Sequence, residues 1–442
     1  MENFRSTLRN TTYLLVCCTL LGAPPALALN KSQSAEYLRT LSRNATTDVD
    51  AAFYNPAGLA FMEQDGFHFA LSNYIIFQQK SIQDQSDMLV GLGFGEPYEA
   101  TAQAFIYPGI HAAYRFSDWA VYFNFIPTGG GGGGTYDNGL PLFDTMILSA
   151  ASDLAGSTPN SYARDMFFEG SSFNLGTTVG AAYKLHDMVS VSLGYRLTYA
   201  LRSYKGHVKA LAVGVGGATL TGAELPDMLS DATITVNSDG IGHSIILGVH
   251  IQPTDELSIG LHTELSGALE LENETAFTGN PNLESMFSTT SFANGAKSDS
   301  RESPFIMAGV DYQITPALLA TTSLFIAINS ISGATAYGDM VDSLFVSAGV
   351  EYAFTDFLTI GTGYAHGTPF LVTRSDLDLS LPHNYVSAGA SIAILDHWAI
   401  NTGFILDFGL TMTNNTSSAP GGGDQIRTEV LQSFSVGVTY TP

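Results

Sequence analysis

Apolar and polar residues alternate along most of the chain after about residue 65. Residues 189–201 give the clearest example, in which one face is apolar and the interleaved face is small, polar or basic. The apolar positions are Val189, Val191, Leu193, Tyr195, Leu197, Tyr199 and Leu201. A period of two indicates β-strands, since a helix would repeat every three to four residues.

The same alternation recurs in residues 344–352 and 398–410. Strands of roughly ten residues match the length that a tilted strand needs to cross a bilayer. A soluble sandwich or barrel would also alternate, but its polar face would carry many Lys and Glu residues. Here that face is mostly Ser, Gly, Thr and Asn, which favours a membrane barrel.

The connections between these segments fall into two alternating kinds. Six are tight turns, centred near residues 117, 186, 254, 315, 355 and 396, and seven are long loops, expected at about 80–100, 128–170, 212–240, 272–302, 333–342, 367–382 and 413–426. This count predicts fourteen antiparallel strands, with the first strand beginning and the last strand ending on the tight-turn side. Closure leaves no unpaired strand edge in lipid. The fold class is therefore all-β, a fourteen-stranded transmembrane β-barrel.

Composition agrees with a barrel in lipid and excludes other classes. Only 13% of the 442 residues are charged, and the mean hydropathy is +0.14, whereas soluble domains average roughly 25% charged residues. The formal charge of −24 with 17 Lys and Arg argues against a nucleic-acid partner, which needs clustered cations.

Residues 1–28 have the features of a secretory signal peptide. Arg5 and Arg9 precede an apolar run that is too short to span a bilayer, and Ala26-Leu27-Ala28 suits cleavage after Ala28. Removal would take away both cysteines, Cys17 and Cys18, and leave neither a disulfide nor a thiolate metal site.

Residues 29–65 form a separate segment ahead of the expected barrel, residues 66–442. A helix is expected over residues 34–41 and a sharp bend at Asn55-Pro56-Ala57-Gly58. The segment is too apolar for a solvated tail, because it contains Leu38, Leu41, Phe53, Tyr54, Leu59 and Phe61. We expect it to fold into the barrel lumen as a plug, or hatch.

Residues 48–60, Asp-Val-Asp-Ala-Ala-Phe-Tyr-Asn-Pro-Ala-Gly-Leu-Ala, resemble the hatch motif of the FadL family of outer-membrane long-chain fatty-acid transporters. The resemblance implies a hatch inside a fourteen-stranded barrel, capture of hydrophobic ligands outside, and release through a lateral opening in the wall. It also implies Asn55, Pro56, Ala57 and Gly58 as gating residues. The family also includes routes for aromatic hydrocarbons, which the sequence does not separate from fatty-acid routes.

A fatty acid needs an apolar tunnel and a cation or hydroxyl for its carboxylate. Alternation directs Arg196 and Arg202 toward the lumen, so these are the candidate head-group ligands, while Phe53, Phe167 and Phe168 are candidate apolar contacts. The alternative is structural: the arginines pair with lumen acids and hold the barrel shape. The acids considered are Glu264, Glu270, Glu351 and Asp407.

Two features of the backbone are also expected to serve transport. Pro56 fixes φ and Gly58 permits a turn forbidden to other residues, which would hold the hatch at a set bend, although a plain turn uses the same residues. Pro108 and Gly109 interrupt the second strand, where proline cannot donate to the ladder, and so mark a candidate lateral opening.

Enzyme motifs are absent from the sequence, and we expect no catalytic residue, cofactor or metal site. His262 and Glu264 share a strand face without a recognisable Ser-His-acid set. The expected partners are hydrophobic small molecules, outer-membrane lipids and the barrel-assembly machinery, for a monomer in a Gram-negative-type outer membrane with both termini periplasmic. A general diffusion porin and an outer-membrane lipid hydrolase remain as alternatives.

Overall fold

The computed structural model describes residues 34–225, 227–279, 282–288, 292–301, 303–330, 334–335, 338–369, 371–373, 381–408, 411–415 and 424–442. The expected signal peptide therefore lies outside the described residues.

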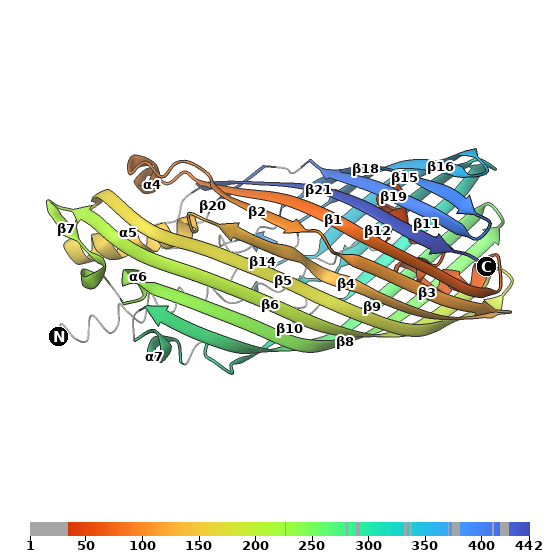
Figure 1. Ribbon diagram of the computed structural model, residues 1–442, viewed down its shortest axis with the longest axis horizontal. Helices are drawn as coiled ribbons and strands as arrows, with labels where there is room; N and C mark the ends of the chain where they lie inside the picture. The colour runs from red at the N-terminus through yellow and green to blue at the C-terminus, as the bar shows by residue number, and fades with distance from the viewer. Residues whose placement is uncertain are drawn as a thin grey trace.

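An antiparallel sheet closes into a ring through fourteen wall positions (Figure 1). Three wall positions are made of two successive strands each, namely β2 with β3, β10 with β11, and β19 with β20. The wall strands, in chain order, are β1 (Gly66–Asp84), β2 (Tyr98–Ala104), β3 (Pro108–Phe116), β4 (Trp119–Tyr136), β5 (Pro159–His186), β6 (Val189–Val215), β8 (Ala232–Thr254), β9 (Leu257–Gly279), β10 (Lys297–Arg301), β11 (Phe305–Thr315), β12 (Leu318–Ala327), β15 (Ser343–Thr355), β16 (Leu358–Gly367), β18 (His383–Leu395), β19 (Trp398–Asp407), β20 (Met412–Asn415) and β21 (Asp424–Tyr440).

The first and last strands close the ring, with register pairs running from Phe69 opposite Tyr440 to Asp84 opposite Gln425. The six predicted tight turns are all present, and they lie at the end of the barrel where β1 begins and β21 ends (Figure 1). The fold class expected from the sequence is therefore confirmed.

Alternation along β6 sorts residues between the outside and the lumen as predicted. Leu193 is 60% exposed and the apolar positions on either side of it also face outward, whereas Arg196 is 0% exposed on the interior face. An apolar exterior with backbone groups paired in a closed ladder is the arrangement that a bilayer requires. Among the described residues, the helices are all too short or too polar to span a membrane.

At the end opposite the tight turns, the wall strands extend into regions where the sequence predicted loops. Residues 128–170 were expected to be a loop, but Gly129 to Gly134 lie in β4, and Phe167 and Phe168 lie in β5. The expected bounds were wrong because β4 stays paired with β5 through these glycines and on to Tyr136, with bulges between Pro127 and Gly129 and between Gly130 and Gly132. Glycine marks bulges as well as loops.

Short elements fill and border this long-loop end (Figure 1). They are α4 (Asp87–Gly91), α5 (Pro141–Ala155), β7 (Ala218–Leu220), η2 (Gly222–Glu224), α6 (Asp227–Ser230) and α7 (Leu283–Phe287). A separate small sheet consists of β13 (Ala334–Thr335), β14 (Gly338–Met340) and β17 (Leu371–Thr373).

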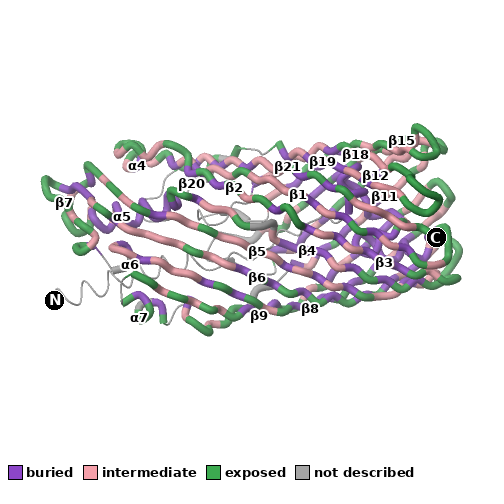
Figure 2. The backbone as a smooth tube through the Cα atoms, in the orientation of Figure 1, coloured by how far each residue is buried: buried purple, intermediate pink, exposed green. Residues whose placement is uncertain are grey.

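Residues 34–65 form the hatch, which lies inside the barrel near the tight-turn end. It contains α2 (Ala35–Thr40), α3 (Ala51–Tyr54) and η1 (Pro56–Phe61), and α2 contacts β15, β16, β18, β19 and β21 while η1 contacts β3 to β6, β8 and β9. Ser34 caps α2 by accepting a hydrogen bond from the Tyr37 amide. Buried residues concentrate at this end of the barrel (Figure 2).

Candidate functional site

The Asn-Pro-Ala-Gly segment of the hatch is bound to the barrel wall by hydrogen bonds to the backbone. Asn55 Nδ2 donates to the Val249 carbonyl at 3.1 Å, and Ser190 Oγ donates to the Ala57 carbonyl at 2.6 Å. Pro56 begins η1, a position that needs no amide donor. These contacts fix the segment against β6 and β8.

Gly58 has a different role from the one its sequence context suggested. Its φ is not positive, so it does not supply a turn forbidden to other residues. Instead, a Cβ placed on Gly58 would lie 2.3 Å from the Thr46 carbonyl oxygen. Glycine is required here for close approach within the hatch.

Glycines of the wall make room for the hatch all along its contact surface. A Cβ at Gly260 would lie 1.9 Å from the Asn44 carbonyl oxygen, and one at Gly363 would lie 2.1 Å from that of Thr40. Several of these glycines are direct ladder partners, such as Gly389 with Gly403. We call the whole set the glycine belt: Gly248, Gly260, Gly309, Gly349, Gly361, Gly363, Gly389, Gly403 and Gly437.

Charged groups add a second set of hatch contacts. Arg39 donates to Glu351 of β15 at 2.9 Å, and Glu36 accepts from Asn401 and Thr439 at 2.7 Å each. Burial raises the pKa of the Glu36 carboxyl, and the nearby Asp50 adds to this rise.

Arg43 organises the hatch from within. It lies 2.8 Å from Asp50 and 2.6 Å from Asp48. Burial alone would raise the pKa of Asp50, but the charge and hydrogen bonds of Arg43 outweigh it and hold this pKa below its ordinary value. The hatch is thus both pinned to the wall and internally paired.

Arg196 forms the buried ion pair that the structural alternative proposed. It donates to Glu264 of β9 and to Thr178 of β5, and its guanidinium lies 5.5 Å from the Phe53 ring. Arg202 is buried on the same face of β6, farther from the hatch along the strand. The structure therefore brings Arg196 and Phe53 together but separates them from Arg202.

Phe167 and Phe168 are neighbours on β5 and so point to opposite sides of the wall. Phe168 packs with Phe143 of α5, whereas Phe167 stacks on His207 at 5.7 Å between ring centroids. Only Phe168 of this pair joins the apolar cluster at the long-loop end.

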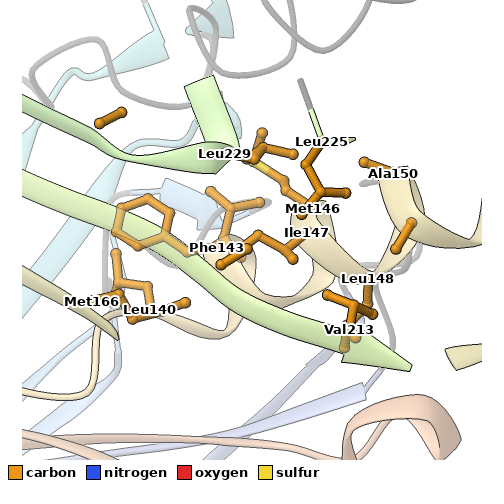
Figure 3. Packing of buried hydrophobic residues seen from close by; sticks show 14 of the residues in the cluster. Leu140, Phe143, Met146, Ile147, Leu148, Ala150, Met166, Val213, Leu225 and Leu229 are labelled. Carbon is orange, nitrogen blue, oxygen red and sulfur yellow. The ribbon is translucent and has the colours of Figure 1, made fainter. Parts of the chain in front are cut away.

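We call that cluster the outer cluster, and α5 supplies much of it (Figure 3). Phe143, Met146 and Ile147 of α5 face residues of β5, β6 and α6. Its members include Leu140, Phe143, Met146, Ile147, Leu148, Met166, Val213, Leu225 and Leu229.

One carboxylate, Asp144 of α5, is buried at the edge of the outer cluster. Arg164 Nε lies 2.6 Å from its Oδ1, Tyr98 donates a hydrogen bond to it, and the Arg164 guanidinium also lies 4.7 Å from the Phe94 ring. Burial raises the pKa of Asp144 to about 6, although Arg164 opposes the rise.

A second apolar cluster, the inner cluster, joins the hatch to the wall. Its hatch members are Tyr37, Leu38, Leu41, Phe53 and Tyr54, and its wall members include Tyr74, Tyr107, Ile126, Phe305 and Phe345. An apolar surface therefore runs from the hatch to the region of Pro108.

The wall ladder is interrupted beside this cluster. Pairing of β2 with β4 ends at Gln103 opposite Gly133, and pairing of β3 with β4 starts at Ile110 opposite Phe125. Residues 104–109 and 126–132 therefore face each other without a ladder, and we call this place the wall gap. Pro108 and Gly109, singled out by the sequence, lie on its edge.

Sequence reasoning missed three features of this site. Asn73, which bonds to the backbone beside the wall gap, had only the break at Pro108 as a nearby signal. The glycine belt was visible as recurring glycines in strands, and the Asp144–Arg164 pair carried no signal because the partners are far from any motif.

His262 and Glu264, the pair weighed for hydrolysis, make structural contacts. His262 Nδ1 lies 3.0 Å from the Tyr54 carbonyl oxygen, and Glu264 binds Arg196. Among the described residues, no group of three or more His, Cys, Asp and Glu side chains is placed to hold a metal ion.

No protein-family model and no curated protein matches the chain. Solved structures do match over nearly its whole length. A Pseudomonas aeruginosa FadL homologue aligns with a TM-score of 0.69 at 15% identity, covering 93% of this chain and 99% of the other. The P. putida toluene transporter TodX gives 0.63 at 14% identity, covering 90% and 95%.

The Ralstonia pickettii toluene transporter TbuX aligns with a TM-score of 0.54 at 16% identity, covering 89% of this chain and 94% of its own. At such identities the likeness concerns the fold. The resemblance read from residues 48–60 is thus confirmed in three dimensions, and the chain has the hatch-containing fourteen-stranded barrel fold of the FadL-type channels.

Proposed function

We propose that this protein is an outer-membrane channel for the passive uptake of hydrophobic small molecules. The observation that carries the proposal is the inner cluster, which extends from the hatch inside the lumen to the wall gap. A general diffusion porin needs an aqueous lumen rather than one filled by an apolar plug.

The proposed route begins at the outer cluster, where a ligand leaves the aqueous phase. It continues along the inner cluster beside Phe53 and ends in the bilayer through the wall gap at Pro108 and Gly109. Movement of Asn55, Pro56, Ala57 and Gly58 would gate the route. Passage needs no energy source, because capture removes apolar surface from water and each later step moves it between apolar environments.

Long-chain fatty acids are the first ligand class that we propose. Arg196 and Arg202 are the two lumen arginines that we propose for the carboxylate, and Arg196 already binds Glu264. A head group at Arg196 would have to displace a buried ion partner, which costs several kcal/mol.

The proposed orientation places the long-loop end outside the cell and the tight turns and both termini in the periplasm. Export by the signal peptide of residues 1–28, insertion by the barrel-assembly machinery and action as a monomer belong to the same proposal.

Uptake of labelled oleate tests this function, in cells that lack their own outer-membrane fatty-acid importer. The variant Asn55→Leu/Pro56→Val/Ala57→Leu removes the Asn55 bond to Val249 and adds bulk at η1. We expect saturable uptake by the unaltered protein and at least a tenfold loss in the variant.

Asn237→Leu serves as the matched control, because Asn237 is exposed on β8 away from the hatch. Heat-modifiable migration on gels checks that each barrel is folded and inserted. Unsaturable uptake, or equal uptake by the hatch variant, would count against gated transport.

Aromatic hydrocarbons are a second candidate class, favoured by the neutralisation of Arg196. An uncharged ring needs no cation, and two of the matching proteins, TodX and TbuX, are toluene transporters. Uptake of labelled toluene but not oleate by the same cells would select this class.

A further inference from the structure

Two polar side chains at the wall gap have positions that the proposed function does not yet explain. Tyr107 lies in the break between β2 and β3, and Asn73 lies beside it on β1. Asn73 bonds to the backbone of the break, and Tyr107 bonds to the backbone of β4.

Asn73 bonds to two polar backbone groups of the break. Its Nδ2 donates to the Phe105 carbonyl at 3.0 Å, and its Oδ1 accepts from the Tyr107 amide at 2.9 Å. It occupies the outward-facing parity of β1, two residues after the exposed Leu71. A polar side chain toward lipid is costly unless it satisfies other polar groups, so Asn73 acts as a clamp that keeps the strand broken.

Tyr107 turns inward while its neighbours turn outward. Its side chain is 1% exposed, against 60% for Phe105 and 78% for Ile106. Its ring lies 6.3 Å from that of Tyr74 and 6.4 Å from that of Phe173. The ring thus forms the part of the inner cluster that lies nearest to the two exposed residues.

The Tyr107 hydroxyl reaches across the wall gap to β4. It donates to the Gly130 carbonyl at 2.9 Å, with the Pro127 carbonyl at 3.4 Å. Both carbonyls belong to the stretch of β4 that lacks a ladder with β2 and β3. Elsewhere in the wall a backbone amide donates to such a carbonyl, whereas here a side-chain hydroxyl does. A side chain can break its hydrogen bond by rotating, without movement of a whole strand.

We propose that Tyr107 is the latch of the lateral exit and that Asn73 is the clamp that keeps the exit formed. In the closed state the Tyr107 hydroxyl joins the two sides of the wall gap. A hydrophobic ligand leaves the inner cluster for the bilayer when this bond breaks and the ring swings aside. The inference rests on the proposed function, because it assigns residues to its last step.

The test measures transfer of a fluorescent fatty acid from preloaded protein in liposomes to a quencher dissolved in the bilayer. Tyr107→Phe keeps the ring and removes the hydroxyl. We expect transfer to be about 2- to 10-fold faster, the range that one neutral hydrogen bond allows. Equilibrium binding of the same probe should change less than twofold, because the ring contacts remain.

Tyr364→Phe is the matched control. Tyr364 donates one hydrogen bond to Asn384 from the exposed face of β16, so the variant also loses one tyrosine hydroxyl bond in the wall. Its transfer rate should equal that of the unaltered protein.

Three outcomes distinguish a failure of the proposed latch from a failure of the proposed transport function. Normal binding with an unchanged transfer rate in Tyr107→Phe would overturn the latch and leave the transport proposal standing. An equal acceleration in Tyr364→Phe would also overturn the latch, since loss of any wall hydroxyl would then suffice. If the unaltered protein binds neither this probe nor toluene, the proposed function itself fails, and the latch with it.

Discussion

At the residue scale, the absence of side chains matters as much as their presence. The glycine belt brings the backbone of the wall close to the backbone of the hatch on strands from β8 round to β21. Glycine in a strand weakens it through lost packing and higher chain entropy, and marks close approach of another backbone. The wall accepts this cost where the hatch covers it.

Gly260→Ala tests this close approach. The new methyl group would lie 1.9 Å from the Asn44 carbonyl oxygen, so the hatch must shift, at a cost of about 1–3 kcal/mol. We expect higher ion conductance of the purified protein in planar bilayers. Gly206→Ala on β6 is the control, because the atom nearest to its methyl group would be 3.8 Å away. Equal conductance of the two variants would contradict the role of the belt.

Asn73→Leu tests the clamp through stability rather than transport. The change leaves the Phe105 carbonyl and the Tyr107 amide without their side-chain partner, which should cost about 2–4 kcal/mol in a low-dielectric environment. Urea titration of the folded barrel measures the loss. Leu71→Ile, on the same outward face of β1, should change stability by less than about 1 kcal/mol.

For single residues, the alternation of the sequence predicts only whether a side chain faces the lumen or the outside of the barrel. The period of β6 placed Arg196 in the lumen, and the structure agrees. Its partner Glu264 lies 68 residues away on β9, and only the register of the sheet brings the two together. The role of Gly58 was misjudged because close approach and a positive φ both select glycine, and a sequence does not separate them.

At the element scale, α2 is held in the lumen by polar bonds at both of its ends. Glu36 bonds to β19 and β21, and Arg39 bonds to β15 and also to Asn401 of β19. A helix of six residues is not stable alone in water, so these contacts and its apolar packing determine its position.

Arg39→Met should loosen the hatch strongly, because it leaves Glu351 largely buried without its partner. Breaking such a pair costs about 3–5 kcal/mol. The double variant Arg39→Met/Glu351→Leu removes both charges and should recover most of the loss. Hydrogen exchange of the hatch amides measures both effects. If the double variant were no better protected than the single one, the ion pair would not be the cause.

The helix α5 carries a pH-sensitive contact at the long-loop end. Burial raises the pKa of Asp144 from 3.8 to about 6, so the folded state binds this proton more tightly than the unfolded chain does. The packing of α5 should therefore gain stability as the pH falls from about 7 to about 4, by at most about 3 kcal/mol, and gain nothing further below that range.

A spin label at Leu154→Cys, near the end of α5, reports this change if the expected cleavage has removed Cys17 and Cys18. The label should become less mobile between pH 7.5 and pH 5. Asp144→Asn should make its mobility independent of pH across this range. Mobility that rises as the pH falls would reverse the assigned sign.

Elements were predictable where one face meets lipid and hard to predict beyond it. The six tight turns were located correctly, because a bilayer of fixed thickness imposes strand length and alternation on that end. Toward the long-loop end, β5 and β6 continue past that thickness, and α5 covers their inner face. No lipid constrains the pattern there, so paired strands were expected to be loops.

At the scale of the whole molecule, the plugged lumen and the interrupted wall ladder lie close together. The hatch fills the lumen near the tight turns, while the wall gap lies beside the inner cluster. On the proposed route, an apolar ligand would cross from this cluster to lipid without meeting water, whereas an ion would have no such route. Under this proposal, selectivity follows from the blocked axis of the barrel.

Removing residues 29–60 should therefore change which solutes pass. The remaining barrel would have an open axis, so ion conductance should rise at least tenfold, and sugars should enter liposomes that contain it. Saturable uptake of hydrophobic ligands should fall, because Phe53, Tyr54 and Leu38 leave the inner cluster with the hatch. Conductance unchanged by the deletion would identify the protein as a general porin. The deletion also removes Arg39 and so leaves the Glu351 carboxylate without its ion partner. The deletion is therefore combined with Glu351→Leu, which removes this uncompensated charge as a cause of misfolding. Only a barrel plugged along its axis predicts opposite changes for ions and for hydrophobic ligands.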